Sequence, residues 1–226
     1  MPTITKRHLK FMKQTFVVFI LMISTTAFSN QDDSELRIKK SFIKTVHKVE
    51  KAVLKLNKKV TPKKATRIAT LVAVEAKRHR QDPRLILSIL NVESGFNQNA
   101  VSKTHDISIA QINPKKWTPS FFKEKTGADL DLKRLKKDEA YAISRMCFIL
   151  DYLKANYGEK DRWWFARYHS ATPKHKREYL RLLAANYKLL KYMDRDLLQE
   201  MPSLEDLEFI NPTRDYSLAS AGVSYE

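Results

Sequence analysis

One carboxylate at the end of an apolar segment, Glu93, is the side chain best placed for acid–base chemistry. It follows the run LILSILNV (residues 85–92), and after a polar stretch a second short apolar run carries Gln111 and Asn113. A carboxyl group among apolar neighbours can stay protonated near neutral pH, because burial disfavours the charged form. Such a group can protonate a leaving oxygen. The pattern therefore leads to the hypothesis of a single acid that cleaves a glycosidic bond.

Glycosidic cleavage has two chemical solutions, and the sequence offers residues for both. Most enzymes use two carboxylates, and Asp106 is the second candidate here. In the other solution the sugar's own acetamido group stabilises the cation. The same glutamate, now ionised, then deprotonates the 6-hydroxyl, and a 1,6-anhydro product forms without water. We interpret Asp106 as a structural carboxylate of a loop and keep hydrolysis assisted by Asp106 as an alternative.

Four ordered motifs surround Glu93 and make the hypothesis specific. They are Glu93-Ser94, Asn99-Ala100-Val101-Ser102, Gln111-Ile112-Asn113 and Tyr168-His169-Ser170, with Tyr179 further on. Together with the segment DPRLILSILNVESGFNQNAVSKTHDISIAQIN, they resemble the catalytic core of lytic transglycosylases with a lysozyme-like soluble lytic transglycosylase domain. The resemblance covers residues 66–190 and is nearest to the small enzymes associated with secretion systems and pili.

The resemblance implies a role for each matched residue. Glu93 is the implied catalytic acid and then base, and Tyr168 is expected to contact and orient it with support from Tyr179. The implied substrate-binding residues are Ser94, Ser102, Gln111, Asn113, Tyr168, His169 and Tyr179. We expect neither a cofactor nor a metal ion, because no His/Cys/Asp cluster with metal-ligand spacing accompanies His169.

Three positions depart from the family's pattern. Ser108 stands where glycine is usual, Ala110 where methionine is frequent, and Ala171 replaces the glycine of one version of the last motif. Glycine permits close approach of the backbone to a ligand. We therefore expect Ser108 to narrow the floor of the cleft.

The first 29 residues have the pattern of a secretory signal. Four basic residues precede the apolar run FVVFILMI (residues 16–23), and Ala27 and Ser29 supply small residues for cleavage before Asn30. The run is too short for a membrane span, which needs about 20 residues, and no later segment is apolar enough for one. We expect an exported protein, periplasmic or secreted, without a stable membrane span. The single cysteine, Cys147, is expected in the core.

The charge of the chain indicates an anionic partner. The formal net charge of +17 falls to +13 once the four basic residues of the signal are removed. Export argues against nucleic acid, whereas the peptide carboxylates of the bacterial wall fit a basic protein. The expected partners are peptidoglycan glycan strands, together with a secretion, conjugation or pilus apparatus that the enzyme could serve.

Apolar periodicity predicts an all-α fold of the lysozyme-like type. We expect a signal peptide at residues 1–29, a basic helical lead at 30–64, a transglycosylase domain at 65–194 and an acidic flexible tail at 195–226. Thr61-Pro62 and Asp82-Pro83 are start signals for two helices, the second of which ends near Gly95. Further helices are expected at residues 120–125, 137–157, 161–168 and 176–193.

The resulting prediction is a lytic transglycosylase that cleaves the β-1,4 bond between N-acetylmuramic acid (MurNAc) and N-acetylglucosamine (GlcNAc). Two alternatives stay open: a lysozyme-type muramidase that uses water, and a non-catalytic wall-binding scaffold of the same fold. The identity of the released ends and the effect of Glu93→Gln distinguish the three.

Overall fold

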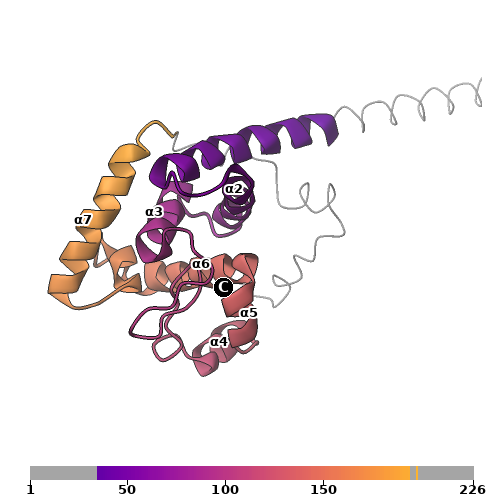
Figure 1. Cartoon of the computed structure of the whole chain (residues 1–226). Coiled ribbons are helices and arrows are strands. Elements are labelled where there is room, and N and C mark those ends of the chain that lie inside the picture. Colours follow the sequence, from indigo (N-terminus) through magenta and orange to yellow (C-terminus); the bar gives the residue numbers. More distant parts are fainter. Residues whose placement is uncertain (1–34, 194–196, 198–226) are drawn as a thin grey trace, which may run out of the picture.

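The computed structural model describes residues 35–193 and Leu197, and every regular element in this part of the chain is a helix. The only β-type pairings between these residues are two isolated bridges. Residues 35–56 are helical, and the named elements that follow are α2 (Pro62–Arg78), α3 (Pro83–Ser94), α4 (Pro119–Thr126), α5 (Leu132–Lys137), α6 (Glu139–Tyr157), the 3₁₀ helix η1 (Trp164–Tyr168) and α7 (Pro173–Leu189). The predicted all-α fold class is confirmed (Figure 1).

Both predicted cap-and-proline signals start helices. The hydroxyl of Thr61 accepts from the backbone N–H of Lys64 at the start of α2. The carboxylate of Asp82 accepts from the N–H of Arg84 at 2.8 Å, at the start of α3. Gly95 ends α3 in the left-handed conformation with φ 59°, which glycine adopts without steric cost. The chain therefore turns sharply two residues after Glu93.

Two of the predicted helices differ from the structure. The long helix expected at residues 137–157 is preceded by a separate short helix, α5, and Asp138 ends α5 and caps α6. The helix expected at 161–168 is the shorter 3₁₀ helix η1. Here Asp161 accepts from the backbone N–H of Trp163 and also contacts the side chains of Arg167 and Lys176. These contacts hold a tight turn where an α-helix would begin.

The leading helix at residues 35–56 shares the core of the domain. Its buried side chains belong to the same apolar cluster as those of α2 and α3, and they include Val46, Val49, Ala52 and Val53. Glu50 accepts a hydrogen bond from Thr66 of α2 at 2.7 Å. Within the basic lead, residues 35–56 therefore form an amphipathic helix, and Figure 1 shows it lying across the end of α3.

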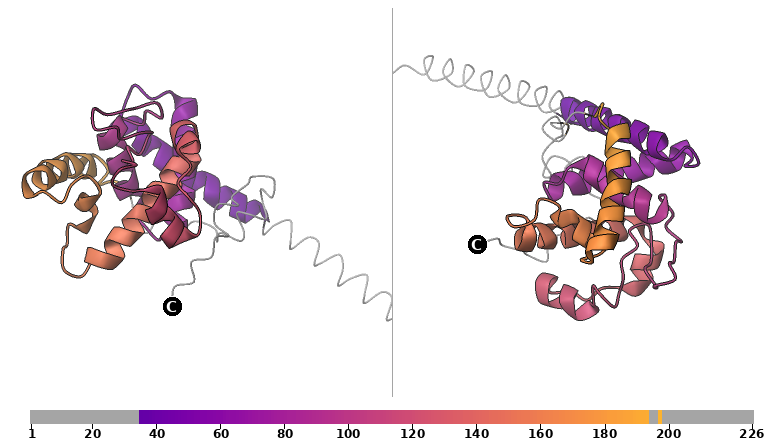
Figure 2. Two further views of the ribbon diagram at one scale, coloured as in Figure 1. Left: turned by 90° about the horizontal axis from the view of Figure 1, so that it is seen from below. Right: turned by 90° about the vertical axis from the view of Figure 1, so that its left-hand side faces the viewer.

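Helix α3 lies between α2 and α7, and α6 packs on α2, α5 and η1. Figure 2 shows α7 along one side of the molecule, next to η1. A hydrogen bond of 2.5 Å between His79 and Asp151 joins the end of α2 to α6. Cys147 on α6 is fully buried, as predicted. These contacts fix the elements that surround the end of α3.

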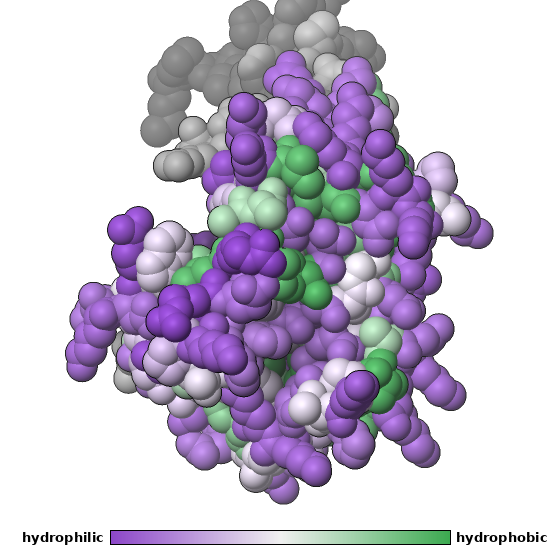
Figure 3. All heavy atoms as spheres, turned by 60° about the vertical axis from the view of Figure 1, so that its left-hand side comes forward, coloured by the Kyte–Doolittle hydropathy of each residue, from purple (hydrophilic) through white to green (hydrophobic). Residues whose placement is uncertain are grey.

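The outer face of this core is largely polar. The side shown in Figure 3 is mainly hydrophilic, with small separate hydrophobic areas. Within residues 35–193, no helix is both long and apolar enough to cross a membrane. The predicted signal peptide (1–29) and the predicted tail (195–226), apart from Leu197, lie outside the described residues.

Candidate active site

Glu93 lies in the last turn of α3, where the buried helix meets a cleft. Its side chain is only 10% exposed, and its Oε1 atom is buried without a hydrogen-bond partner. The buried part of α3, from Leu85 to Leu90, is largely apolar and packed in the core, and Glu93 follows it at the end of the helix. A buried acceptor without a partner is costly. The arrangement leaves Oε1 free to bind a group that enters the cleft.

The cleft has a volume of about 360 Å³ and contains five of the eight predicted site residues. Its lining residues are Glu93, Thr104, Asp106, Gln111, Asn113, Lys116, Trp117, Tyr168, His169, Ser170 and His175. They come from the end of α3, the loop of residues 101–118, the end of η1 with the residues after it, and the first turn of α7. The loop and the segment from η1 to α7, which are distant in sequence, therefore converge on Glu93.

Tyr179 and His169 form the immediate surroundings of the carboxylate. Tyr179 is fully buried in α7, and its hydroxyl faces Glu93 without a well-formed hydrogen bond. Burial, followed by the negative charge of Glu93, raises the pKa of Tyr179 well above its usual value, so the hydroxyl stays protonated. The His169 ring stacks on Tyr179, and its Nδ1 lies 3.7 Å from Glu93 Oε1. Interaction with Glu93 raises the pKa of His169.

Tyr168 does not hold Glu93 in the way we expected. Its buried hydroxyl donates a 2.7 Å hydrogen bond to the carbonyl oxygen of Ala110. Tyr168 therefore anchors the loop opposite Glu93, and the hydroxyl next to the carboxylate is that of Tyr179. The expected roles of the two tyrosines are exchanged, because α7 rather than η1 faces the end of α3.

Lys116 is a cleft residue that the sequence reasoning missed. Its Nζ donates to the carbonyl oxygens of Arg167 and Tyr168, each at 2.9 Å, and so ties the loop to η1. Loss of solvent around the ammonium group lowers the pKa of Lys116, and the negative charges of Glu93 and Asp106 act in the opposite direction. No periodicity or motif marks this lysine, because its partners lie about fifty residues further along the chain.

Asp106 is the centre of a hydrogen-bonded loop rather than a free carboxylate. Its Oδ2 accepts from Ser102 at 2.8 Å and from Thr104 at 2.6 Å, and its Oδ1 accepts from Asn113 at 2.5 Å. Both oxygens therefore have partners within the loop. Asn113 lines the cleft while its amide donates into the loop, and Ser102 is not among the lining residues.

Ser94 and Gln111 also make contacts inside the fold. The Ser94 hydroxyl donates to the carbonyl oxygen of Ile109 at 2.7 Å and fastens the loop to α3. The amide of Gln111 donates to the carbonyl oxygens of Ala100 and Ser108. Gln111 lines the cleft and Ser94 does not. Of the predicted substrate-binding residues, Ser94 and Ser102 thus shape the loop next to the cleft.

Ser108 affects the backbone of the loop and not the floor of the cleft. It is 1% exposed, does not line the cleft, and has φ 76°. His105 and Gln111 also have left-handed φ values, so the loop turns at every third residue, while buried isoleucines between these turns anchor it to the core. The expected narrowing of the cleft is wrong. The glycine position is instead a place where a side chain costs backbone strain.

Helices on both sides of α3 brace its end. Asn57, just after the leading helix, donates to the carbonyl oxygen of Gly95 at 2.9 Å. On the other side, Asn186 of α7 accepts from Asn91 and donates to the carbonyl oxygen of Ser88, both at 3.2 Å. Among the described residues, no group of three or more His, Cys, Asp or Glu side chains could hold a metal ion.

Comparison with known families gives one match, which spans Glu93. Residues 70–169 match the family model of the transglycosylase SLT domain. This segment contains Glu93 and most of the cleft, but not the leading helix or Tyr179. No curated protein and no solved structure matches the chain. The match and the all-helical fold support a lysozyme-like domain of the lytic transglycosylase class.

Proposed function

We propose that this protein is an exported peptidoglycan lytic transglycosylase with Glu93 as its single acid and base. The observation that carries the proposal is the Glu93 carboxylate, whose buried Oε1 has no hydrogen-bond partner at the edge of a polar cleft. The match of residues 70–169 to the transglycosylase SLT domain supports peptidoglycan as the substrate. The bond cleaved is the β-1,4 linkage from MurNAc to GlcNAc.

The reaction needs the same carboxyl group to give up one proton and then to take up another. Protonated Glu93 gives its proton to the glycosidic oxygen as the C1–O bond breaks, and the acetamido group of the MurNAc ring stabilises the cation. Ionised Glu93 then takes the proton of the 6-hydroxyl, whose oxygen bonds to C1. The products are a GlcNAc 4-hydroxyl and a 1,6-anhydroMurNAc end, with no water consumed and Glu93 protonated again.

The neighbours of Glu93 suit the ionised half of this cycle. When it is protonated, His169 places a positive charge 3.7 Å from Oε1, and the Tyr179 hydroxyl lies on the buried side of the carboxylate, where it can donate. Opposite charge and donated hydrogen bonds both favour a carboxylate. They would stabilise Glu93 after it has released its proton and hold it at the sugar's 6-hydroxyl.

The surroundings of Asp106 bear on the choice between this reaction and hydrolysis by a muramidase. A second carboxylate that activates water needs an oxygen free to accept the water's proton. Asp106 lines the cleft, but both of its oxygens already accept hydrogen bonds within the loop, Oδ2 from Ser102 and Thr104 and Oδ1 from Asn113. This supports a single-carboxylate transglycosylase over the muramidase. The braced position of Glu93, whose Oε1 has no hydrogen-bond partner, likewise favours an enzyme over a wall-binding scaffold.

The setting of the enzyme follows from the sequence and is part of the proposal. We propose export through the segment 1–29 and action in the periplasm or outside the cell. There the enzyme would open local gaps in the wall, in the service of a secretion, conjugation or pilus apparatus.

Product analysis tests the proposal directly. Purified mature protein is incubated with murein sacculi, and the released ends are identified by mass spectrometry. We expect 1,6-anhydroMurNAc ends, and a loss of about 10³-fold or more in rate for Glu93→Gln. Reducing MurNAc ends would establish the muramidase instead. A Glu93→Gln variant that clears sacculi like the parent would show that the assignment of Glu93 is wrong.

A further inference from the structure

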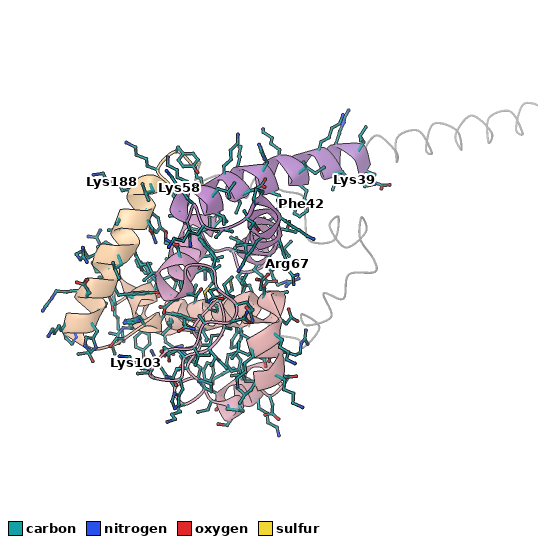
Figure 4. All side chains as sticks on the ribbon, viewed as in Figure 1. Lys39, Phe42, Lys58, Arg67, Lys103 and Lys188 are labelled. Atoms are coloured by element: carbon teal, nitrogen blue, oxygen red, sulfur yellow. The ribbon has the colours of Figure 1, made fainter. Side chains whose placement is uncertain are left out.

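A second cavity lies on another part of the domain. It has a volume of about 440 Å³ and is formed by the first turn of α2, the loop after α3 and the junction of α5 with α6. It shares no lining residue with the cleft of Glu93. In Figure 4, Arg67 points into the space between α2 and the α5–α6 junction. We refer to this cavity as the basic pocket.

Positive charge dominates the basic pocket. Lys63, Lys64, Arg67 and Lys137 line it, against one acidic residue, Glu139. Glu139 is largely buried and is paired with Arg67, with 3.0 Å between Oε2 and Nε. Within the described residues, the three lysines make no ion pair. The pocket therefore has three uncompensated positive charges around it.

The local backbone adds to this charge. Lys63 and Lys64 lie in the first turn of α2, which has no acidic residue. The amino-terminal end of a helix carries a partial positive charge and is stabilised by anions, so lysines there are unfavourable for the helix itself. Asn97 and Asn99 are exposed at the opposite wall and supply amide groups. A bound anion would balance the lysine charges, interact favourably with the amino-terminal end of α2 and accept from the asparagine amides.

One loop forms a wall of the basic pocket and a wall of the catalytic cleft. Asn97 to Asn99 lie at the pocket, and the next residue, Ala100, accepts from the Gln111 amide at 2.9 Å. Gln111 lines the cleft. The two cavities are therefore linked through a single hydrogen-bonded segment of the loop.

We propose that the basic pocket binds carboxylates of the peptide stems attached to the glycan strand. This rests on the proposed function for the identity of the polymer. Flexible lysines suit carboxylates that vary in position along a strand, since an ammonium group is a point charge without a fixed fork geometry. The pocket then holds the wall polymer while Glu93 acts on its glycan, and it contributes to affinity more than to the chemical step.

The test measures binding in a background that cannot cleave. Glu93→Gln protein is co-sedimented with murein sacculi, alone or with Lys63→Gln, Lys64→Gln and Lys137→Gln combined. The matched control combines Lys123→Gln, Lys154→Gln and Lys188→Gln, three exposed lysines outside both cavities that change the net charge equally. Thermal unfolding verifies that each variant is folded. Because no turnover is needed, this result is separate from the test of Glu93.

We expect the pocket variant to bind sacculi about tenfold more weakly and the control to stay within about twofold. Raising the salt concentration should shrink the difference. When the carboxyl groups of the sacculi have been converted to neutral amides, the parent should bind them only as well as the pocket variant binds unmodified sacculi. Equal losses in the pocket and control variants would overturn the proposal, as would full binding to amidated sacculi. Retention only on sacculi that carry a phosphate polymer would assign the pocket to phosphate instead.

Discussion

The imidazole ring of His169 lies parallel to the phenol ring of Tyr179, with ring centroids 4.7 Å apart and 9° between the planes. The stack joins the segment after η1 to α7 and places Nδ1 of His169 beside Glu93. The spacing of these residues in the sequence predicts neither the ring stack nor the contact with Glu93. A carboxylate, a phenol and an imidazole from three separate parts of the chain thus form one compact unit.

The pairing of His169 with Glu93 predicts a pH-dependent contribution to stability. Because Glu93 raises the pKa of His169 above 6.5, the contribution is fully present below pH 6.5 and is lost as pH rises through the folded-state pKa. The ring is 47% exposed, so we expect only about 0.5 kcal/mol after solvent screening. Urea unfolding gives the difference in free energy of unfolding between the parent and His169→Gln, and this difference should be larger at about pH 6 than at about pH 9 by that amount. A difference that does not change with pH would contradict the ion pair.

Removal of the Tyr179 hydroxyl should separate activity from stability. The hydroxyl is buried without a well-formed hydrogen bond, so Tyr179→Phe should change the free energy of unfolding by less than about 1 kcal/mol. We expect the rate of anhydro-end release to fall about tenfold or more, because Glu93 loses a donor. Tyr168→Phe is the contrast. It breaks the bond to Ala110 and should cost about 1–2 kcal/mol of stability. Full activity in Tyr179→Phe would remove this residue from the site.

Asn57 should position the catalytic helix from outside the segment that matches the family. Its side-chain Nδ2 donates to the carbonyl oxygen of Gly95, and its side-chain Oδ1 accepts from the backbone N–H of Lys59. Asn57→Ala should lower the free energy of unfolding by about 1 kcal/mol. Asn57→Asp keeps the acceptor but turns an oxygen toward the Gly95 carbonyl, so we expect it to lower the free energy of unfolding further than Asn57→Ala does. The rate of cleavage of sacculi should likewise be lowest in Asn57→Asp and intermediate in Asn57→Ala. Equal behaviour of the two variants would show that the bond to Gly95 is unimportant.

The left-handed backbone at Ser108 predicts a ranking of substitutions. Ser108→Gly should keep or raise the free energy of unfolding by up to about 1 kcal/mol, because glycine adopts φ 76° without strain. Ser108→Val should lower it by about 2 kcal/mol, since a β-branched residue is strongly disfavoured there. Chemical denaturation measures both. Similar stability in the two variants would mean that the loop relaxes away from the left-handed conformation.

Much of the helical framework could be predicted from local chemistry. Thr61-Pro62, Asp82-Pro83 and Gly95 act within a few residues of themselves, so the bounds of α2 and α3 follow directly from the sequence. The break at Asp138 was missed although its cause is local, since Asp138 caps α6 through the N–H of Tyr141. The 3₁₀ form of η1 could not be predicted in this way, because Asp161 also contacts Lys176 of α7, which only the tertiary structure brings close.

The sequence by itself determined the all-helical class and placed Glu93 at the end of a buried helix. It also marked Ser108 as unusual, although the reason lies in the backbone and not in the cleft. Only the tertiary structure decided that Tyr179, rather than Tyr168, faces the carboxylate, and that Lys116 closes the loop on η1. The physical reason is that caps and periodicity act over a few residues, whereas partners of Glu93 are brought together by the packing of α3 against α7.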